Sequence, residues 1–207
     1  MHLKFTVKSS DDGDTEVLKT SDNEEELGKL VEKLVDREKR HITIAYFSKE
    51  VAACVTWEAI RNVVEKSAKN WITSPAKREL VANTFNTFGD DHELLVKQYL
   101  PTLGMFAFRA TLIEGVGEWL VANHGNEVCR TFYTENRADQ HWHPHVTLGV
   151  LRGDVDKALV GKMAVSKYSD GAKRWIEATG VVSSDDNTSV HVVFPTSEEQ
   201  GPNSFYP

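Results

Sequence analysis

The sequence predicts an α+β protein made of two similar halves, and three observations support this fold class. The chain of 207 residues has 40% hydrophobic and 27% charged side chains, which is typical of a globular protein with a sizeable core. Strand-like alternation and helix-like periodicity follow one another along it. The order strand, helix, hairpin occurs twice, and each time the strand begins with His-x-Thr. We therefore expect one domain over residues 1–207, with halves at about 20–100 and 101–195 and a tail at 196–207.

The first half, from about residue 20, is predicted to begin with a helix followed by a strand. Ahead of this half, the first ten residues alternate in polarity and predict a short strand. Ser21 and Glu24 have the spacing of a capping box, which favours a helix over 21–39. The segment 41–47 follows directly and is rich in β-branched and aromatic residues, so it predicts a strand. The apolar face of the expected helix consists of Leu27, Leu30, Val31, Leu34 and Val35.

A second helix and a hairpin complete the first half. Apolar residues spaced three and four apart predict a helix over 57–70, with Thr56 as its N-cap. Two strand-like segments, 80–88 and 92–99, flank the turn sequence Gly-Asp-Asp at 89–91. This arrangement predicts a β-hairpin.

The second half repeats this order. Apolar periodicity predicts a helix around 112–120 that ends near Gly125, where glycine supplies a left-handed cap. The segment 145–151 alternates like the earlier His-x-Thr strand. The sequence Arg-Gly-Asp at 152–154 predicts a loop and N-cap, followed by a helix that continues to about Met163.

A final hairpin closes the second half. Its expected strands are 174–183 and 188–194, and the Asp-Asp-Asn sequence at 185–187 is the turn between them. Both halves therefore contain a His-x-Thr strand, a helix and a hairpin, which predicts an internal duplication of architecture.

The two His-x-Thr strands carry the strongest functional signal. Residues i and i+2 of a strand point to the same side, so each strand presents an imidazole and a hydroxyl opposite its aliphatic residues. If a pseudo-twofold axis relates the halves, the two pairs face each other across a cleft. Two imidazoles that titrate near neutrality can move protons around a phosphodiester. The alternative is that both histidines only cap strands or satisfy core hydrogen bonds. The four residues are His41, Thr43, His145 and Thr147.

Five further residues near these strands are candidates for substrate binding. Tyr46 and Trp142 could stack on a base, although strand aromatics more often pack in the core. His143 is expected to line the mouth of the cleft. Lys49 and Arg152 lie at the ends of the two strands, where they either meet phosphate charge or remain solvated cations.

Metal binding is not expected. His141, His143 and His145 alternate, but Pro144 disturbs the geometry and no Asp, Glu or Cys follows at ligand spacing. We therefore expect a site without metal or other cofactor.

These motifs resemble those of a known family. The two tripeptides are similar to the paired H-x-T signatures of the 2H phosphoesterase superfamily. Residues Trp142 to Gly149 resemble the aromatic-x-Pro-His-x-Thr-Leu-Gly form of its 2′-5′ RNA ligase-like branch, and Phe85 to Gly89 resemble the Phe-Gly turn between the motifs. The resemblance implies a bilobal α+β fold whose two antiparallel sheets face a central cleft, with helices outside. It also implies metal-independent opening of 2′,3′-cyclic phosphates on nucleotides or RNA ends, with both histidines and both threonines as catalytic residues.

Two other functions stay open. Residues His41 to Lys49 also resemble the first motif of phage anti-CBASS nucleases, which belong to the same superfamily and degrade cyclic oligonucleotide immune signals. A function of a different class is a binding module that grips RNA ends without turnover. The net charge of −7 disfavours a long nucleic-acid track. The expected partner is therefore a cyclic nucleotide or a cyclic phosphate end of RNA.

The sequence also predicts a location. It contains no stretch of about 18 apolar residues that could span a membrane, and its start does not resemble a signal peptide. Cys54 and Cys129 are its only cysteines and show no CxxC spacing, which disfavours a disulfide framework. We expect a cytoplasmic monomer without membrane contact.

Overall fold

The computed structural model describes residues 1–9, 23–36, 39–70, 79–136, 142–163, 175–183 and 192–193. Within these ranges helices and strands are mixed, so the α+β class is confirmed. In chain order the elements are β1 (His2–Ser9), α1 (Glu24–Gly28), β2 (Val31–Leu34), β3 (Thr43–Tyr46), α2 (Lys49–Ala52), α3 (Trp57–Asn70), β4 (Glu79–Phe88), β5 (Leu94–Pro101), α4 (Leu103–His124), α5 (Asn126–Glu135), β6 (His145–Leu151), α6 (Lys157–Val160), β7 (Trp175–Ser183) and β8 (Val192–Val193).

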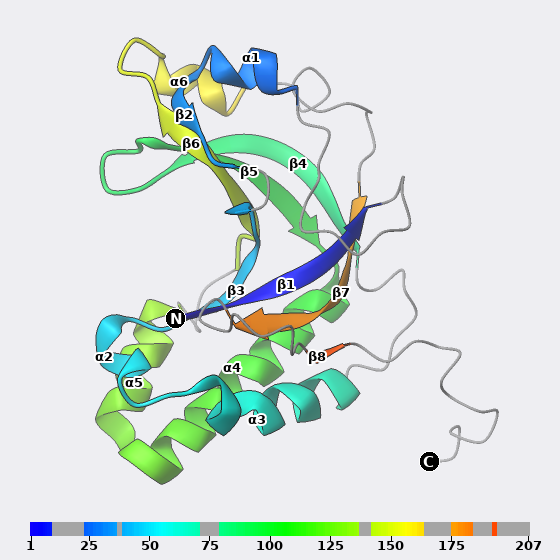
Figure 1. Ribbon diagram of the computed structural model, residues 1–207, viewed down its shortest axis with the longest axis vertical. Helices are drawn as coiled ribbons and strands as arrows, with labels where there is room; N and C mark the ends of the chain where they lie inside the picture. The colour runs from blue at the N-terminus through cyan, green and yellow to red at the C-terminus, as the bar shows by residue number, and fades with distance from the viewer. Residues whose placement is uncertain are drawn as a thin grey trace, which may run out of the picture.

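The strands form two antiparallel sheets. One has the order β2-β6-β5-β4, and the other contains β7, β1 and β3, with β8 paired to β7. A short pairing between β4 and β7, from Glu79 with Glu177 to Val81 with Trp175, joins them into one ladder. Figure 1 shows the two sheets splaying apart from this junction. The two His-x-Thr segments belong to different sheets, on β3 and β6.

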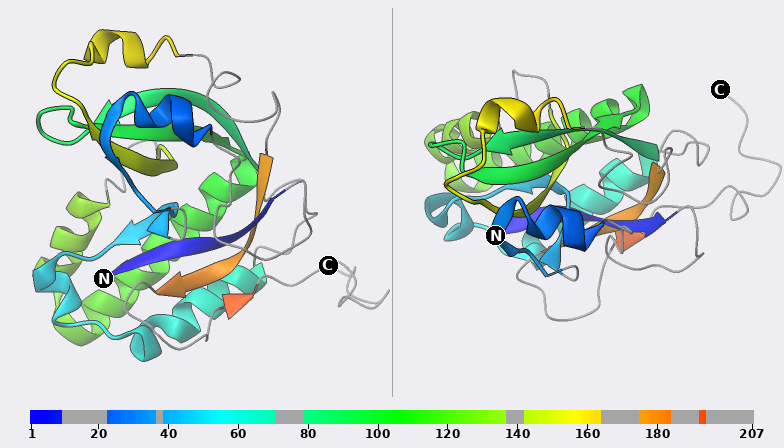
Figure 2. Two further views of the ribbon diagram at one scale, coloured as in Figure 1. Left: turned by 45° about the horizontal axis from the view of Figure 1, so that its top comes forward. Right: turned by 90° about the horizontal axis from the view of Figure 1, so that it is seen from above.

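The helices lie outside the sheets. Figures 1 and 2 show α1 and α6 beside the sheet that contains β6, and α2 to α5 beside the sheet that contains β3. Aromatic contacts join helices to strands, such as Phe5 of β1 to Phe108 of α4, with ring centroids 6.1 Å apart. Phe47, just after β3, lies 5.1 Å from Phe132 of α5. Across the described ranges no helix has both the length and the apolarity needed to cross a bilayer.

Several predicted elements are confirmed. Helix α3 has the predicted bounds, and its first turn is capped by Thr56, whose Oγ1 accepts the Ala59 N–H at 3.3 Å. Strand β6 also has the predicted bounds, and β4 and β5 form the predicted hairpin. Gly89 begins the hairpin turn with φ +94°. Helix α4 ends at Gly125, with φ +88°.

The predicted long helix over 21–39 is wrong. The chain instead forms the short helix α1, in which Asn23 Oδ1 caps the Glu26 N–H at 3.2 Å, and then the strand β2. Leu27 is buried from α1, whereas Val31 is buried in β2, where it pairs with Leu151 at the end of β6, so the apolar residues do not share one helical face. Ser21, the expected cap, lies outside the described residues.

The second half also contains a helix that was not predicted. Helix α5 follows Gly125 and folds back against α4. The packing is close, because a Cβ on Gly117 would lie 2.1 Å from Tyr133 Oη. Helix α6 is shorter than expected and is capped by Asp156, not by Asp154. Strands β7 and β8 confirm the final hairpin where it is described, whereas its turn at 185–187 lies outside.

Candidate active site

The two His-x-Thr segments show the predicted alternation. Ile42 and Ile44 are buried on one side of the first segment, while His41 and Thr43 are partly exposed on the other. In β6 the pattern is the same. Val146 and Leu148 are buried in the core, and His145 and Thr147 are partly exposed. Each segment therefore fixes its polar pair through the burial of its aliphatic residues.

Both histidines are held by the same local hydrogen bond. Nδ1 of His41 lies 2.8 Å from the Lys39 carbonyl oxygen, and Nδ1 of His145 lies 2.9 Å from the His143 carbonyl oxygen. A carbonyl can only accept, so Nδ1 donates its proton in both rings. In the neutral form Nε2 is then the basic nitrogen. Both side chains are thus oriented to exchange protons through Nε2.

Burial is the main influence on the pKa of both imidazoles. Burial lowers the pKa of His145 below its ordinary value of 6.5, the His143 hydrogen bond opposes this shift, and the charge of His41 lowers the pKa further. Burial also lowers the pKa of His41, the Lys39 hydrogen bond raises it, and the charge of Lys4 lowers it. The charge of His41 is therefore one of the groups that lower the pKa of His145.

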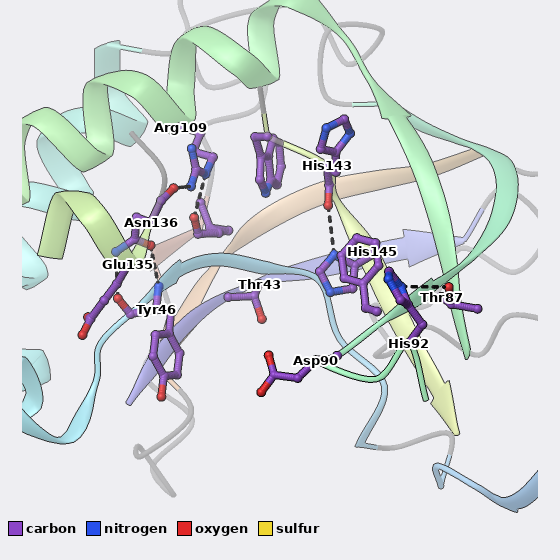
Figure 3. A pocket seen from close by; sticks show the side chains of 14 residues that line it. Thr43, Tyr46, Thr87, Asp90, His92, Arg109, Glu135, Asn136, His143 and His145 are labelled. Carbon is purple, nitrogen blue, oxygen red and sulfur yellow. Dashed lines mark hydrogen bonds between the residues drawn. The ribbon is translucent and has the colours of Figure 1, made fainter. Parts of the chain in front are cut away.

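A cavity of about 540 Å³ opens between the two sheets. Its lining includes Thr43 and Tyr46 from β3, His145 from the start of β6, and Trp142 and His143 from the segment just before it. Figure 3 shows the Thr43 and His145 side chains entering this space from different strands. Its volume lies within the range of small-molecule sites in proteins. The cavity can therefore hold a ligand against the imidazole of His145.

The β4–β5 turn forms another wall of the cavity. Phe88 packs its ring on His145, with centroids 4.4 Å apart. Asp90 and His92 also line the space (Figure 3). His92 has φ +53°, an uncommon value for a residue other than glycine, and its Nδ1 lies 3.3 Å from Thr87 Oγ1. The turn thus adds an aromatic contact, a carboxylate and a third imidazole to the site.

Two side chains from the helices bind the outer edge of β3. Asn136 Oδ1 accepts the Tyr46 N–H at 2.7 Å, and its Nδ2 donates to the Tyr46 carbonyl at 2.8 Å. Arg109 Nε donates to the Ile44 carbonyl at 2.9 Å, and its Nη2 donates to the Asn136 carbonyl at 2.6 Å. These bonds substitute for a neighbouring strand. They position the strand that carries Thr43.

The structure brings together only some of the predicted site residues. Thr43, Tyr46, Trp142, His143 and His145 line the cavity. His41 is linked to His145 through its charge, and Thr147 shares the face of β6 with His145, although neither belongs to the lining.

Two predicted cations lie elsewhere. Lys49 begins α2 and is exposed. Arg152 makes a two-point ion pair with Asp154, at 3.0 and 3.2 Å, and lines a separate shallow depression beside Glu32. The structure therefore supplies no contact between either cation and the cavity.

Sequence reasoning missed the cations that do lie near the site. Lys4 of β1 is in register with Thr43 and alternates with the buried residues Leu3 and Phe5, so it projects to the same side as Thr43. The alternation of Lys4 with two apolar residues could have predicted from the sequence that Lys4 lies on the polar face of β1. Arg109 and Asn136 come from α4 and from the end of α5, and no local pattern connects them to β3.

Within the described part of the chain, no group of three or more His, Cys, Asp or Glu side chains is placed to hold a metal ion. His141 lies outside the described residues. No protein-family model matches the chain, and no curated protein matches it.

Proposed function

We propose that this protein is a metal-independent phosphodiesterase that opens 2′,3′-cyclic phosphates on nucleotides or RNA ends. The observation that carries the proposal is the pair of imidazoles, His41 and His145. Both donate Nδ1–H to the backbone, and the charge of His41 lowers the pKa of His145. Proton transfer at a phosphodiester needs one neutral and one protonated group. Mutual charge repulsion disfavours the doubly protonated form and so favours this mixed state.

The proposed reaction has two proton transfers. The neutral histidine takes a proton from water as its oxygen attacks phosphorus, and the protonated histidine gives a proton to the ribose oxygen as its bond to phosphorus breaks. The product is a ribose phosphate monoester with one free hydroxyl. The two histidines exchange charge states during the reaction and return to the starting state by proton exchange with water.

Three nearby groups suit the charge that develops on phosphorus. Thr43 lines the cavity, and we propose that Thr43 and Thr147 donate hydrogen bonds to nonbridging oxygens. Lys4, on the same side of the sheet as Thr43, adds a positive charge, and this charge lowers the pKa of His41. Its attraction for an anion would offset part of the desolvation cost of the phosphate.

We further propose that the fold is the bilobal 2H phosphoesterase fold with an internal duplication. The support is the repeated order of strand, helix and hairpin, β3 with α3 and β4–β5 in one half and β6 with α6 and β7–β8 in the other. The identical bond from each histidine to the carbonyl two residues before it adds local support.

Product analysis tests the function. The protein is incubated with nucleoside 2′,3′-cyclic monophosphates and, separately, with cyclic dinucleotides, and products are separated by chromatography. We expect the 2′,3′-cyclic ring to open. Preferential cleavage of the cyclic dinucleotides would assign the protein to the nuclease alternative, and tight binding without turnover of either would make it a binding module.

A further inference from the structure

Arg109 is a buried cation on the wall of the cavity. It is 8% exposed and projects from α4 into the lining (Figure 3). Its guanidinium also lies 5.6 Å from the centre of the Trp142 ring. Two of its five N–H donors bind the carbonyls of Ile44 and Asn136. The other three make no hydrogen bond within the described ranges.

The charge of Arg109 has no counter-ion in the described part of the chain. Glu135 and Asp90 line the same cavity, but no ion pair joins either of them to Arg109. Burial lowers the pKa of Arg109 to about 10, so the side chain remains protonated at neutral pH. A buried cation whose partners are two neutral carbonyls and an aromatic ring is costly unless an anion joins it.

We infer that Arg109 binds a second phosphate of the substrate, distinct from the cyclic phosphate at the two histidines. The planar guanidinium matches the oxygens of a phosphate, and two of its three remaining donors can bind two of these oxygens side by side. That the anion is a phosphate rests on the proposed function. A nucleotide whose 2′ and 3′ oxygens form the cyclic phosphate carries its second phosphate at the 5′ oxygen. The substrate class is therefore a 5′-phosphorylated or oligomeric nucleotide that ends in a cyclic phosphate.

Binding of product-like ligands tests this inference without any turnover. Adenosine 3′-monophosphate and adenosine 3′,5′-bisphosphate are titrated into the full-length protein by calorimetry at constant ionic strength. We expect the bisphosphate to bind at least about tenfold more tightly, as one charge-assisted bidentate contact allows. Equal affinities for the two ligands would overturn the inference, whatever any variant shows.

Variants assign the preference to Arg109. Arg109→Met should reduce the bisphosphate preference to about twofold or less, because the charge is lost while much of the volume remains. Arg130→Met, on the exposed face of α5, changes the net charge equally and should keep the preference. A folded Arg109→Met variant that keeps the full preference would refute the assignment. If this variant does not fold, Arg109→Lys is measured in its place. We expect it to reduce the bisphosphate preference at least about threefold. An unchanged preference in this variant would refute the assignment to Arg109.

The same measurements separate this inference from the proposed function. A bisphosphate preference that depends on Arg109, together with no hydrolysis of any cyclic phosphate, would remove the enzymatic proposal and leave the second phosphate site standing. Hydrolysis that depends on the two histidines, with no bisphosphate preference, would support the enzymatic proposal and remove the second phosphate site.

Discussion

The replacement Asn136→Ala tests how β3 is held in place. The Asn136 side chain is 6% exposed and makes three hydrogen bonds, two to the backbone of Tyr46 and one to the Phe132 carbonyl at 2.9 Å. With a net value of about 0.5 to 1.5 kcal/mol for each bond, the variant should lose about 2 to 4 kcal/mol of unfolding free energy. For a chain of this size that corresponds to a fall in Tm of about 5 to 15 °C.

The replacement Asn136→Asp gives a sharper version of this test. The introduced carboxylate can still accept the Tyr46 N–H but would face two carbonyl oxygens that the amide previously bonded. Burial and the two carbonyl oxygens should raise its pKa in the folded protein above the unfolded value, against the opposing attraction of the Arg109 guanidinium, which donates to the Asn136 backbone carbonyl. The folded state then binds the proton more tightly, so the stability deficit of this variant should shrink as pH falls from 7 towards 4.

Urea unfolding followed by circular dichroism measures both variants. Asn123→Ala is the matched control, because Asn123 is exposed and makes one bond to the Trp119 carbonyl. It should cost no more than about 0.5 kcal/mol. If Asn136→Ala lies within the same limit, side-chain pairing does not hold the edge of β3 and the account of the site is wrong.

Three further predictions concern the site and its surroundings. Burial lowers the pKa of both site histidines, so kcat/KM should be highest below about pH 6.5. Lys4→Met removes a positive charge that lowers the pKa of His41, so the limb of the pH–rate profile that belongs to His41 should move to higher pH. Lys4→Arg keeps this charge and should move neither limb. An unchanged profile for Lys4→Met would show that this charge does not act on His41. Gly149→Ala places a Cβ 2.5 Å from the Lys33 carbonyl oxygen of β2 and should cost about 1 to 3 kcal/mol in urea unfolding, whereas an unchanged midpoint would contradict this packing. Turnover should survive EDTA, and loss of activity that zinc restores would contradict the two-histidine mechanism.

Local patterns predicted the strands and helices whose burial depends on their own periodicity. Strand β6 and helix α3 have the predicted bounds because each buries one regular face. The helix expected over 21–39 failed because spacings of three and four residues also arise in a short helix followed by a strand. Tertiary pairing of Val31 with Leu151 decided between the two.

The candidate site was predictable where it depends on alternation and not where it depends on distant packing. The polar faces at His41 and His145 follow from the buried aliphatic residues beside them. By contrast, Arg109 reaches β3 only because α4 packs along that sheet, 65 residues later in the chain. No local pattern encodes such a contact, and the same is true of Asn136.

The central claim is that His41 and His145 act as one acid–base pair, and turnover of the two alanine variants tests it most directly. The substrate is a nucleoside 2′,3′-cyclic monophosphate, and circular dichroism confirms that each variant is folded. His124→Ala is the matched control, because His124 is exposed at the end of α4. We predict that His41→Ala and His145→Ala each lose at least about 100-fold in kcat, with the double variant little worse than the poorer single one. A folded His145→Ala protein with turnover close to that of the wild type would contradict the claim.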